Sequence, residues 1–167
     1  WELKKDYNEN NPTEVNIVWV AIRTSPEGEK AEYITGFKTN PNSGVITSYV
    51  PDREKYPLFQ LGDLYNRDNY SNKIIRSESL FPTAYETHYK TLLKYLIDRE
   101  EAVKTLESEK KYEYYHSALN FVEENGVKTF GILVYADAED LIEFVENNPV
   151  KTLVIYKALA SKPYVNW

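Results

Sequence analysis

The sequence contains no cysteine among its 167 residues. This absence excludes disulfide bonds, thiolate nucleophiles and cysteine-ligated metal sites. It leaves the redox compartment open, because a cysteine-free chain suits the inside of a cell and its surroundings equally. Methionine is absent as well. Because a complete gene product begins with methionine, we expect this chain to start inside a longer protein.

Basic charge and long apolar runs are also scarce. There are 20 Lys and Arg residues against 26 Asp and Glu residues, which gives a net charge of −6 and an isoelectric point near 5.1. A nucleic-acid backbone demands a basic face, so this balance argues against nucleic acid and against attachment to anionic lipid by charge. No apolar run approaches the length of about 18 residues that indicates a membrane span, and no signal peptide is visible.

A glycine-rich phosphate loop is missing at the place where one would be expected. The stretch GVKTFGILVYADAEDLIEFVENNPVKTLVIYKA, residues 126–158, reads as strand, helix and strand. Its first junction carries Asp137, Glu139 and Asp140, whereas a nucleotide site needs glycines and free backbone N–H groups there. The carboxylates complement the helix dipole and repel phosphate. We therefore predict a self-capping helix and no cofactor.

No other pattern indicates catalysis or a metal site. His88 and His116 lie beside apolar helical stripes, as surface or boundary residues, without the spacing of a zinc helix. Asp98, Glu100 and Glu101 offer carboxylates for glycoside hydrolysis, but neighbouring helical positions point in different directions, which is typical of a solvated face. GxSxG elbows, P-loops and EF-hand loops do not occur. We predict a non-enzymatic protein without a metal.

The composition supports one folded domain. Hydrophobic residues make up 42% of a chain that is long enough to bury a core. Residues 1–13 are polar and asparagine-rich, which is typical of a linker or arm. We expect a single α+β domain over 14–167 with an insert at about 51–108, whose first part lacks hydrophobic periodicity.

Hydrophobic patterning predicts the strands and helices of this domain. Strands are predicted at 15–23, 44–50, 127–135 and 151–157, and helices at about 84–107, 112–125 and 137–148. Both faces of the first strand are apolar, so we expect it to be central. After it, Ser25 and Pro26 favour a short helix up to Phe37, with a strand through Tyr33, Thr35 and Phe37 as the alternative.

Two interleaved strand–helix–strand halves predict a ferredoxin-like βαββαβ fold. Its four-stranded antiparallel sheet would carry an inserted loop and extra helices. Helices would cover one face of the sheet and the insert would cover the other. An open mixed sheet with helices on both sides is the alternative. We expect these side chains to belong to the core: Phe130, Leu133, Ile142 and Phe144.

Tyrosine is unusually frequent, with 15 copies. Its apolar ring and polar hydroxyl suit both core boundaries and the binding of glycans or peptides. The following tyrosines recur at core spacing on predicted helices and are expected to be structural: Tyr85, Tyr89, Tyr112 and Tyr115. Four tyrosines of the insert region are the candidate ligand-binding residues: Tyr49, Tyr56, Tyr65 and Tyr70.

The last part of the chain resembles a known family. The run from Ala118 to Trp167 is similar to the end of the sigma factor regulator C-terminal domain. The similarity lies in VEENGV before a strand, in a short helix that closes on NPVK, and in the aromatic end VNW. Residues 14–50 are similar as well, through the first strand and the proline turn after it, whereas 51–108 show no resemblance.

The resemblance implies a modular protein. Such domains form the extracytoplasmic part of membrane-anchored anti-sigma factors of Gram-positive bacteria, such as the anti-sigma-M type. The sigma factor would be held by a cytoplasmic segment that this chain lacks, and one membrane span would lie upstream of Trp1. The domain itself would be an extracellular, non-enzymatic sensory domain whose ligand is unknown.

Two alternatives remain open. The first is a cell-envelope module that recognises glycan or peptide through its tyrosine-rich insert. The second is a hydrolase that uses Asp98 or Glu101. No functional residue of the family can be carried over to this chain.

Overall fold

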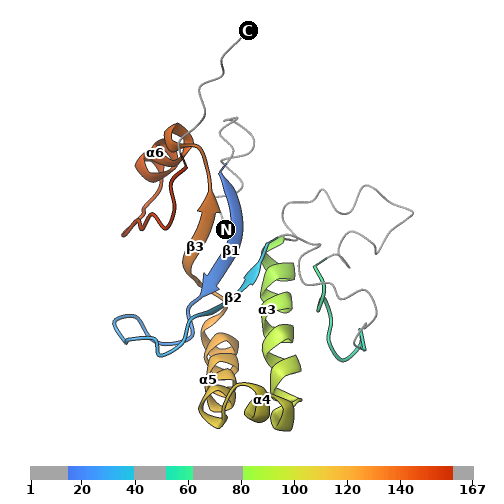
Figure 1. Ribbon diagram of the computed structural model, residues 1–167. Helices are drawn as coiled ribbons and strands as arrows, with labels where there is room; N and C mark the ends of the chain where they lie inside the picture. The colour runs from blue at the N-terminus through green and yellow to red at the C-terminus, as the bar shows by residue number, and fades with distance from the viewer. Residues whose placement is uncertain (1–14, 40–51, 62–80, 160–167) are drawn as a thin grey trace, which may run out of the picture.

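The computed structural model describes residues 15–39, 52–61 and 81–159 (Figure 1). These residues form an α+β fold, as predicted. Its strands and helices are, in chain order, β1 (Asn16–Ile22), β2 (Thr35–Lys38), α3 (Phe81–Ile97), α4 (Glu100–Leu106), α5 (Glu109–Asn125), β3 (Thr129–Tyr135) and α6 (Ala138–Asn147).

The described strands form an antiparallel sheet in the order β2-β1-β3. Val20 of β1 pairs with Phe37 of β2 on one side and with Ile132 of β3 on the other. The β-branched and aromatic residues of the β1 sequence NIVWVAI favour this extended conformation. The predicted central position of the first strand is therefore confirmed.

The core lies between the sheet and two helices, α3 and α5, which pack beside each other and are joined through α4 (Figure 1). Phe37 of β2 stacks on Tyr85 of α3 with ring centroids 5.3 Å apart. Helix α5 begins where the Ser108 side chain accepts a hydrogen bond from the Lys111 backbone N–H, and it ends at Gly126, whose φ is 74°. The buried cluster includes Val20, Phe37, Tyr89, Leu93, Tyr115, Ala118 and Val122.

The predicted short helix after β1 is wrong. Gly28, with a φ of 93°, lies within a turn in which the Glu29 N–H donates to the Pro26 carbonyl. The chain then enters β2, so the alternative strand through Thr35 and Phe37 is confirmed. The free edge of β1 decides this outcome, because a strand there gains hydrogen bonds and buries Phe37, whereas a short helix interrupted by glycine gains little.

The strand predicted at 151–157 is also wrong. Residues 151–159 belong to no strand, and all are exposed. A strand needs a hydrogen-bonding neighbour, β1 is already paired on both edges, and within the described residues this segment pairs with neither β2 nor β3. The predicted strand at 44–50 lies outside the described residues, as does the predicted arm at 1–13. The four-stranded ferredoxin-like arrangement is therefore not confirmed.

The expected core of the last third is only partly correct. Phe144 of α6 is buried, at 5% exposed, as predicted. Phe130, Leu133 and Ile142 are 48%, 42% and 58% exposed, so their assignment to the core is wrong. The reason is that helices α3 and α5 bury one face of the sheet, while the described residues leave much of the other face at β3 uncovered.

Candidate functional site

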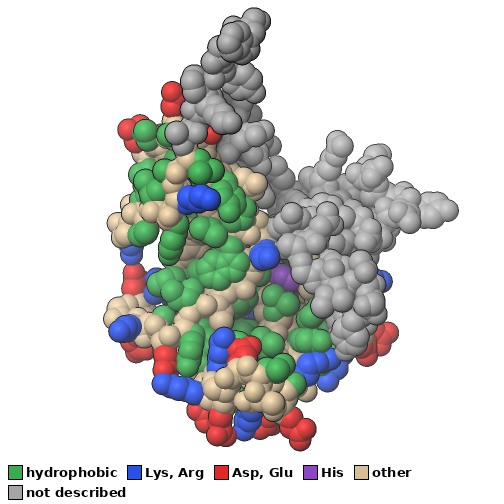
Figure 2. Space-filling model, viewed as in Figure 1, with side chains coloured by type: hydrophobic (Ala, Val, Ile, Leu, Met, Phe, Trp, Pro, Cys, Tyr) green, Lys and Arg blue, Asp and Glu red, His purple; other side chains and the backbone are tan. Residues whose placement is uncertain are grey.

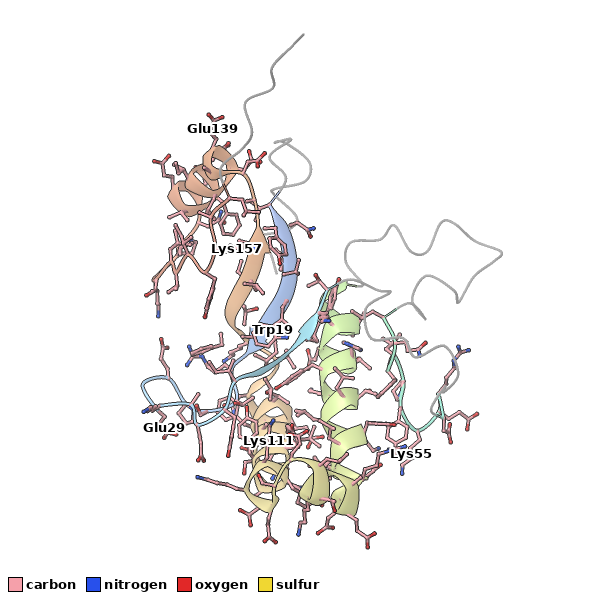
Figure 3. The ribbon with its side chains drawn as sticks, in the orientation of Figure 1. Trp19, Glu29, Lys55, Lys111, Glu139 and Lys157 are labelled. Carbon is pink, nitrogen blue, oxygen red and sulfur yellow. The ribbon has the colours of Figure 1, made fainter. Side chains whose placement is uncertain are left out.

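A pocket of about 360 Å³ lies between the β1–β2 connection and α5. The connection contributes residues 24–25 and 30–32, and α5 contributes one face of its first two turns. In Figure 3 the connection, which carries Glu29 near its tip, projects away from the sheet. The lining residues are Thr24, Ser25, Lys30, Ala31, Glu32, Lys110, Glu113, Tyr114 and Ser117.

A chain of hydroxyl groups links one wall of this pocket to the core. The Tyr114 hydroxyl donates to the Tyr33 carbonyl at 3.2 Å and lies 2.9 Å from Thr24 Oγ1 and 3.0 Å from Thr35 Oγ1. Thr35 Oγ1 lies 2.6 Å from the Tyr89 hydroxyl. Burial raises the pKa of Tyr89, so its hydroxyl stays protonated and can donate. The network therefore ties α5 to the start of the β1–β2 connection, to β2 and to α3 at one point.

Charges of both signs surround the pocket. Lys110 of α5 forms an ion pair with Glu32 of the connection, and the hydrogen bond to Glu32 raises the pKa of Lys110. Lys30 and Glu113 line the pocket too. Within the described part of the chain, neither of these two side chains forms an ion pair. The pocket therefore offers one cation and one anion that are not already neutralised.

A second feature is an apolar surface formed by β3, α6 and the segment after α6. The residues of this surface are between 37% and 87% exposed. They are Phe130, Leu133, Tyr135, Ile142, Val150, Leu153, Val154, Ile155, Tyr156 and Leu159. Figure 2 shows hydrophobic side chains gathered over this part of the molecule. Exposed apolar surface of this kind is typical of contact with another molecule.

The comparisons with known proteins identify the family. The model of the family described as sigma factor regulator C-terminal matches residues 2–156. The chain belongs to the sigma factor regulator C-terminal family. Searches of curated proteins and of solved structures found no match. The resemblance seen in the sequence is thus confirmed, and the match also spans 51–108, where no resemblance was visible.

Membership makes this chain a regulatory domain of the anti-sigma type, and the family is not a known enzyme family. No helix among the described residues is long and apolar enough to cross a membrane. In the same residues, no three His, Asp or Glu side chains come together in a way that could hold a metal ion.

Two of the three carboxylates considered for hydrolysis, Asp98 and Glu100, serve as ion-pair partners in this regulator domain. Asp98 lies 2.8 Å from the Lys55 ammonium, and its hydrogen bonds to Lys55 and Tyr56 lower its pKa. Glu100 lies 2.9 Å from Lys104, which lowers the pKa of Glu100. A general acid needs a raised pKa. The two environments therefore favour structural roles.

Of the four candidate ligand-binding tyrosines, only Tyr56 lies within the described residues. It is 5% exposed, and its hydroxyl donates to Asp98 Oδ2 at 2.8 Å. Its ring meets that of Tyr95 at 5.3 Å between centroids. These contacts hold residues 52–61 against α3. Ligand binding by Tyr49, Tyr56, Tyr65 and Tyr70 stays a prediction.

Sequence reasoning missed the burial of His88. It is 7% exposed, with Nδ1 2.7 Å from the Leu58 carbonyl oxygen and its ring edge-on to Phe37. Thr91, one turn along α3, donates to the neighbouring Pro57 carbonyl at 2.7 Å. Residues 52–61 lack the periodicity that would have indicated packing against α3, so the pattern of the helix alone placed His88 at its boundary.

The buried His88 predicts a dependence of stability on pH. Burial lowers the pKa of His88 below its ordinary value of 6.5. Below that pH the unfolded chain binds a proton that the folded chain does not. As the pH is lowered from 7 to 5, the free energy of unfolding should therefore decrease, by up to about 1.4 kcal/mol per pH unit. Urea titrations across this range measure the slope.

Two variants isolate the residue responsible. His88→Gln should lose most of the slope, whatever its absolute stability. His116→Gln should keep the slope, because His116 is exposed. Equal slopes in the wild-type protein and in His88→Gln would show that His88 is not the buried neutral group.

Proposed function

We propose that this chain is the extracytoplasmic, signal-receiving domain of a membrane-anchored anti-sigma factor of a Gram-positive bacterium. The family match over residues 2–156 carries the proposal. A separate cytoplasmic segment of the same protein holds the sigma factor. The domain, a single unit over 14–167, binds a signal outside the membrane and shifts the protein between two states through a membrane span.

The features of the described residues support a domain that works by contact. Two of the carboxylates that could serve catalysis are engaged with lysines, at 2.8 Å for Asp98 and 2.9 Å for Glu100. The exposed side chains of the apolar surface and the pocket are suited to binding. A chain without cysteine also folds without dependence on the redox state of its surroundings, since it can form no disulfide bond.

Cysteine labelling in intact cells tests the proposed location. Because this domain lacks cysteine, single cysteines can be added to a full-length protein that has been freed of any others. Leu106→Cys replaces a side chain that is 83% exposed, whereas Val122→Cys replaces one that is 0% exposed. A membrane-impermeant maleimide should label Leu106→Cys in intact cells and leave Val122→Cys unlabelled.

Cell lysis provides the control for this experiment. After lysis the labelling of Leu106→Cys should not increase, since every copy was already accessible. If Leu106→Cys is labelled only after lysis, the domain faces the cytoplasm and the proposed location is wrong.

The domain by itself should not bind the sigma factor. A stable complex needs an interface of about 1,200 Å² or more, and in the proposed arrangement the membrane separates the two partners. Calorimetry should detect no association between the 167-residue chain and the sigma factor that the full-length protein regulates. The cytoplasmic segment of the full-length protein is the positive control. A Kd below about 1 µM for the domain would overturn the proposal and place this domain in the cytoplasm.

A further inference from the structure

We propose that the pocket between the β1–β2 connection and α5 binds a small zwitterion, namely an amino acid or a short peptide. The binding of such a ligand would act as an extracellular signal only if the proposed function is correct. The binding event itself depends on the pocket alone.

The charges around the pocket define the class of ligand. Two lysines and two glutamates line it, Lys30, Lys110, Glu32 and Glu113, so its net charge is zero. A site for a phosphate would carry excess positive charge, and a site for a metal ion would carry excess negative charge. A ligand with one carboxylate and one ammonium group matches a balanced set.

The pairing within this set leaves two groups to meet the ligand. Lys110 of α5 and Glu32 of the connection, which both line the pocket, pair with each other. Lys30 and Glu113 make no ion pair within the described residues, and both are exposed. We assign Lys30 to the ligand carboxylate and Glu113 to the ligand ammonium.

The remaining lining limits the ligand to a small polar molecule. Thr24, Ser25, Tyr114 and Ser117 contribute hydroxyl groups, which can hydrogen-bond to a peptide group. Ala31 adds apolar surface to the wall, so the lining is mixed in character. The volume of about 360 Å³ lies near the lower end of the usual range for ligand pockets, about 300–1,000 Å³.

The pocket is placed so that occupancy affects the rest of the domain. Tyr114 joins it to Thr24, just after β1, and, through Thr35, to Tyr89 in the core. A ligand that bridges the connection and α5 would therefore stabilise the joint between the sheet and both long helices. Binding to the folded state alone also raises the thermal midpoint of the domain.

Titration calorimetry with L-alanyl-L-alanine tests this site on the 167-residue chain at pH 7. We expect saturable binding with a Kd of about 1 mM or tighter. Three further probes separate the parts of the ligand: acetate, ethylamine, and N-acetylalanine amide, which carries no charge. Each should bind at least tenfold more weakly than the dipeptide.

Matched variants place the binding at the pocket. Lys30→Gln and Glu113→Gln should each weaken dipeptide binding about tenfold, since each loses one charge-assisted hydrogen bond. Lys128→Gln and Glu123→Gln make the same charge changes at exposed positions outside the pocket and should stay within about twofold. Far-ultraviolet circular dichroism checks that all four variants fold.

Three results would overturn the inference. They are the absence of saturation up to about 20 mM dipeptide, equal binding of acetate and dipeptide, and equal effects of the pocket and control variants. The cysteine-labelling result stands apart from all three. If the dipeptide binds but labelling places the domain in the cytoplasm, the site remains and only its meaning as an extracellular signal is lost.

Discussion

Replacing Gly36 by alanine is expected to lower the free energy of unfolding by about 3 kcal/mol. A Cβ atom at this position would lie 2.7 Å from Trp19 Cζ2 and 2.8 Å from the Val20 carbonyl carbon, and closer still to the Val20 carbonyl oxygen. Trp19 lies on β1 next to β2 (Figure 3). The clash involves the β1 backbone, so it can be relieved only by disturbing the pairing of Ala21 with Gly36.

Gly131 provides the matched control in the strand on the other side. Ala21 pairs with both glycines, but a Cβ atom at Gly131 would meet nothing within 4 Å. Gly131→Ala should therefore stay within about 1 kcal/mol of the wild-type protein. Urea denaturation of the two variants measures the difference. Similar stabilities would show that β2 does not pair with β1 in the register described.

Replacing Leu93 by alanine should cost about 2–5 kcal/mol of stability. Leu93 is 2% exposed and lies in the buried cluster with Tyr89 of α3 and Val122 of α5. Its truncation removes apolar contacts and leaves a cavity between the two long helices. Thermal unfolding followed by circular dichroism at 222 nm reports the loss.

Leu106→Ala, at the end of α4, is the matched surface control for Leu93→Ala. Its side chain is 83% exposed, so Leu106→Ala should change stability by less than about 0.5 kcal/mol. Comparable losses from the two substitutions would mean that α3 and α5 do not form the core of the domain.

Helix α5, most of α3 and the central strand could be predicted from the sequence because each has a strong local signal. The single helix predicted at 84–107 is wrong in its second part, because α3 ends at Ile97 and a separate helix, α4, begins at Glu100. Tyr85, Tyr89 and Leu93 recur every four residues along α3, and both faces of β1 are apolar. The stop at Gly126 likewise follows from the freedom of glycine to adopt a positive φ. In these elements the local preference and the global packing agree.

The elements that were predicted wrongly depend on their neighbours. Residues 25–37 have a weak helix pattern. The last part of this segment forms β2 instead, because it pairs with the open edge of β1. Residues 151–157 have the composition of a strand but no hydrogen-bonding neighbour in the sheet. Phe130 and Leu133 look like core residues in a sequence, and only the placement of the helices on one face left them exposed.

The candidate site could not be found in the same way. Thr24 and Tyr114 are 90 positions apart, and no local pattern connects the β1–β2 connection to α5. The tyrosine content pointed instead to the insert region, where Tyr56 proves to be buried against α3.

The sequence by itself determined the α+β class, the family, the acidic and cysteine-free character, and the absence of a recognisable catalytic motif. These properties depend on composition, on short spacings and on similarity along the chain. The tertiary structure alone decided the sheet order, the exposure of the apolar surface, the burial of His88 and the pocket beside Tyr114. The physical reason is that these features arise from contacts between segments far apart in the chain, where hydrogen-bond pairing and packing override local preference.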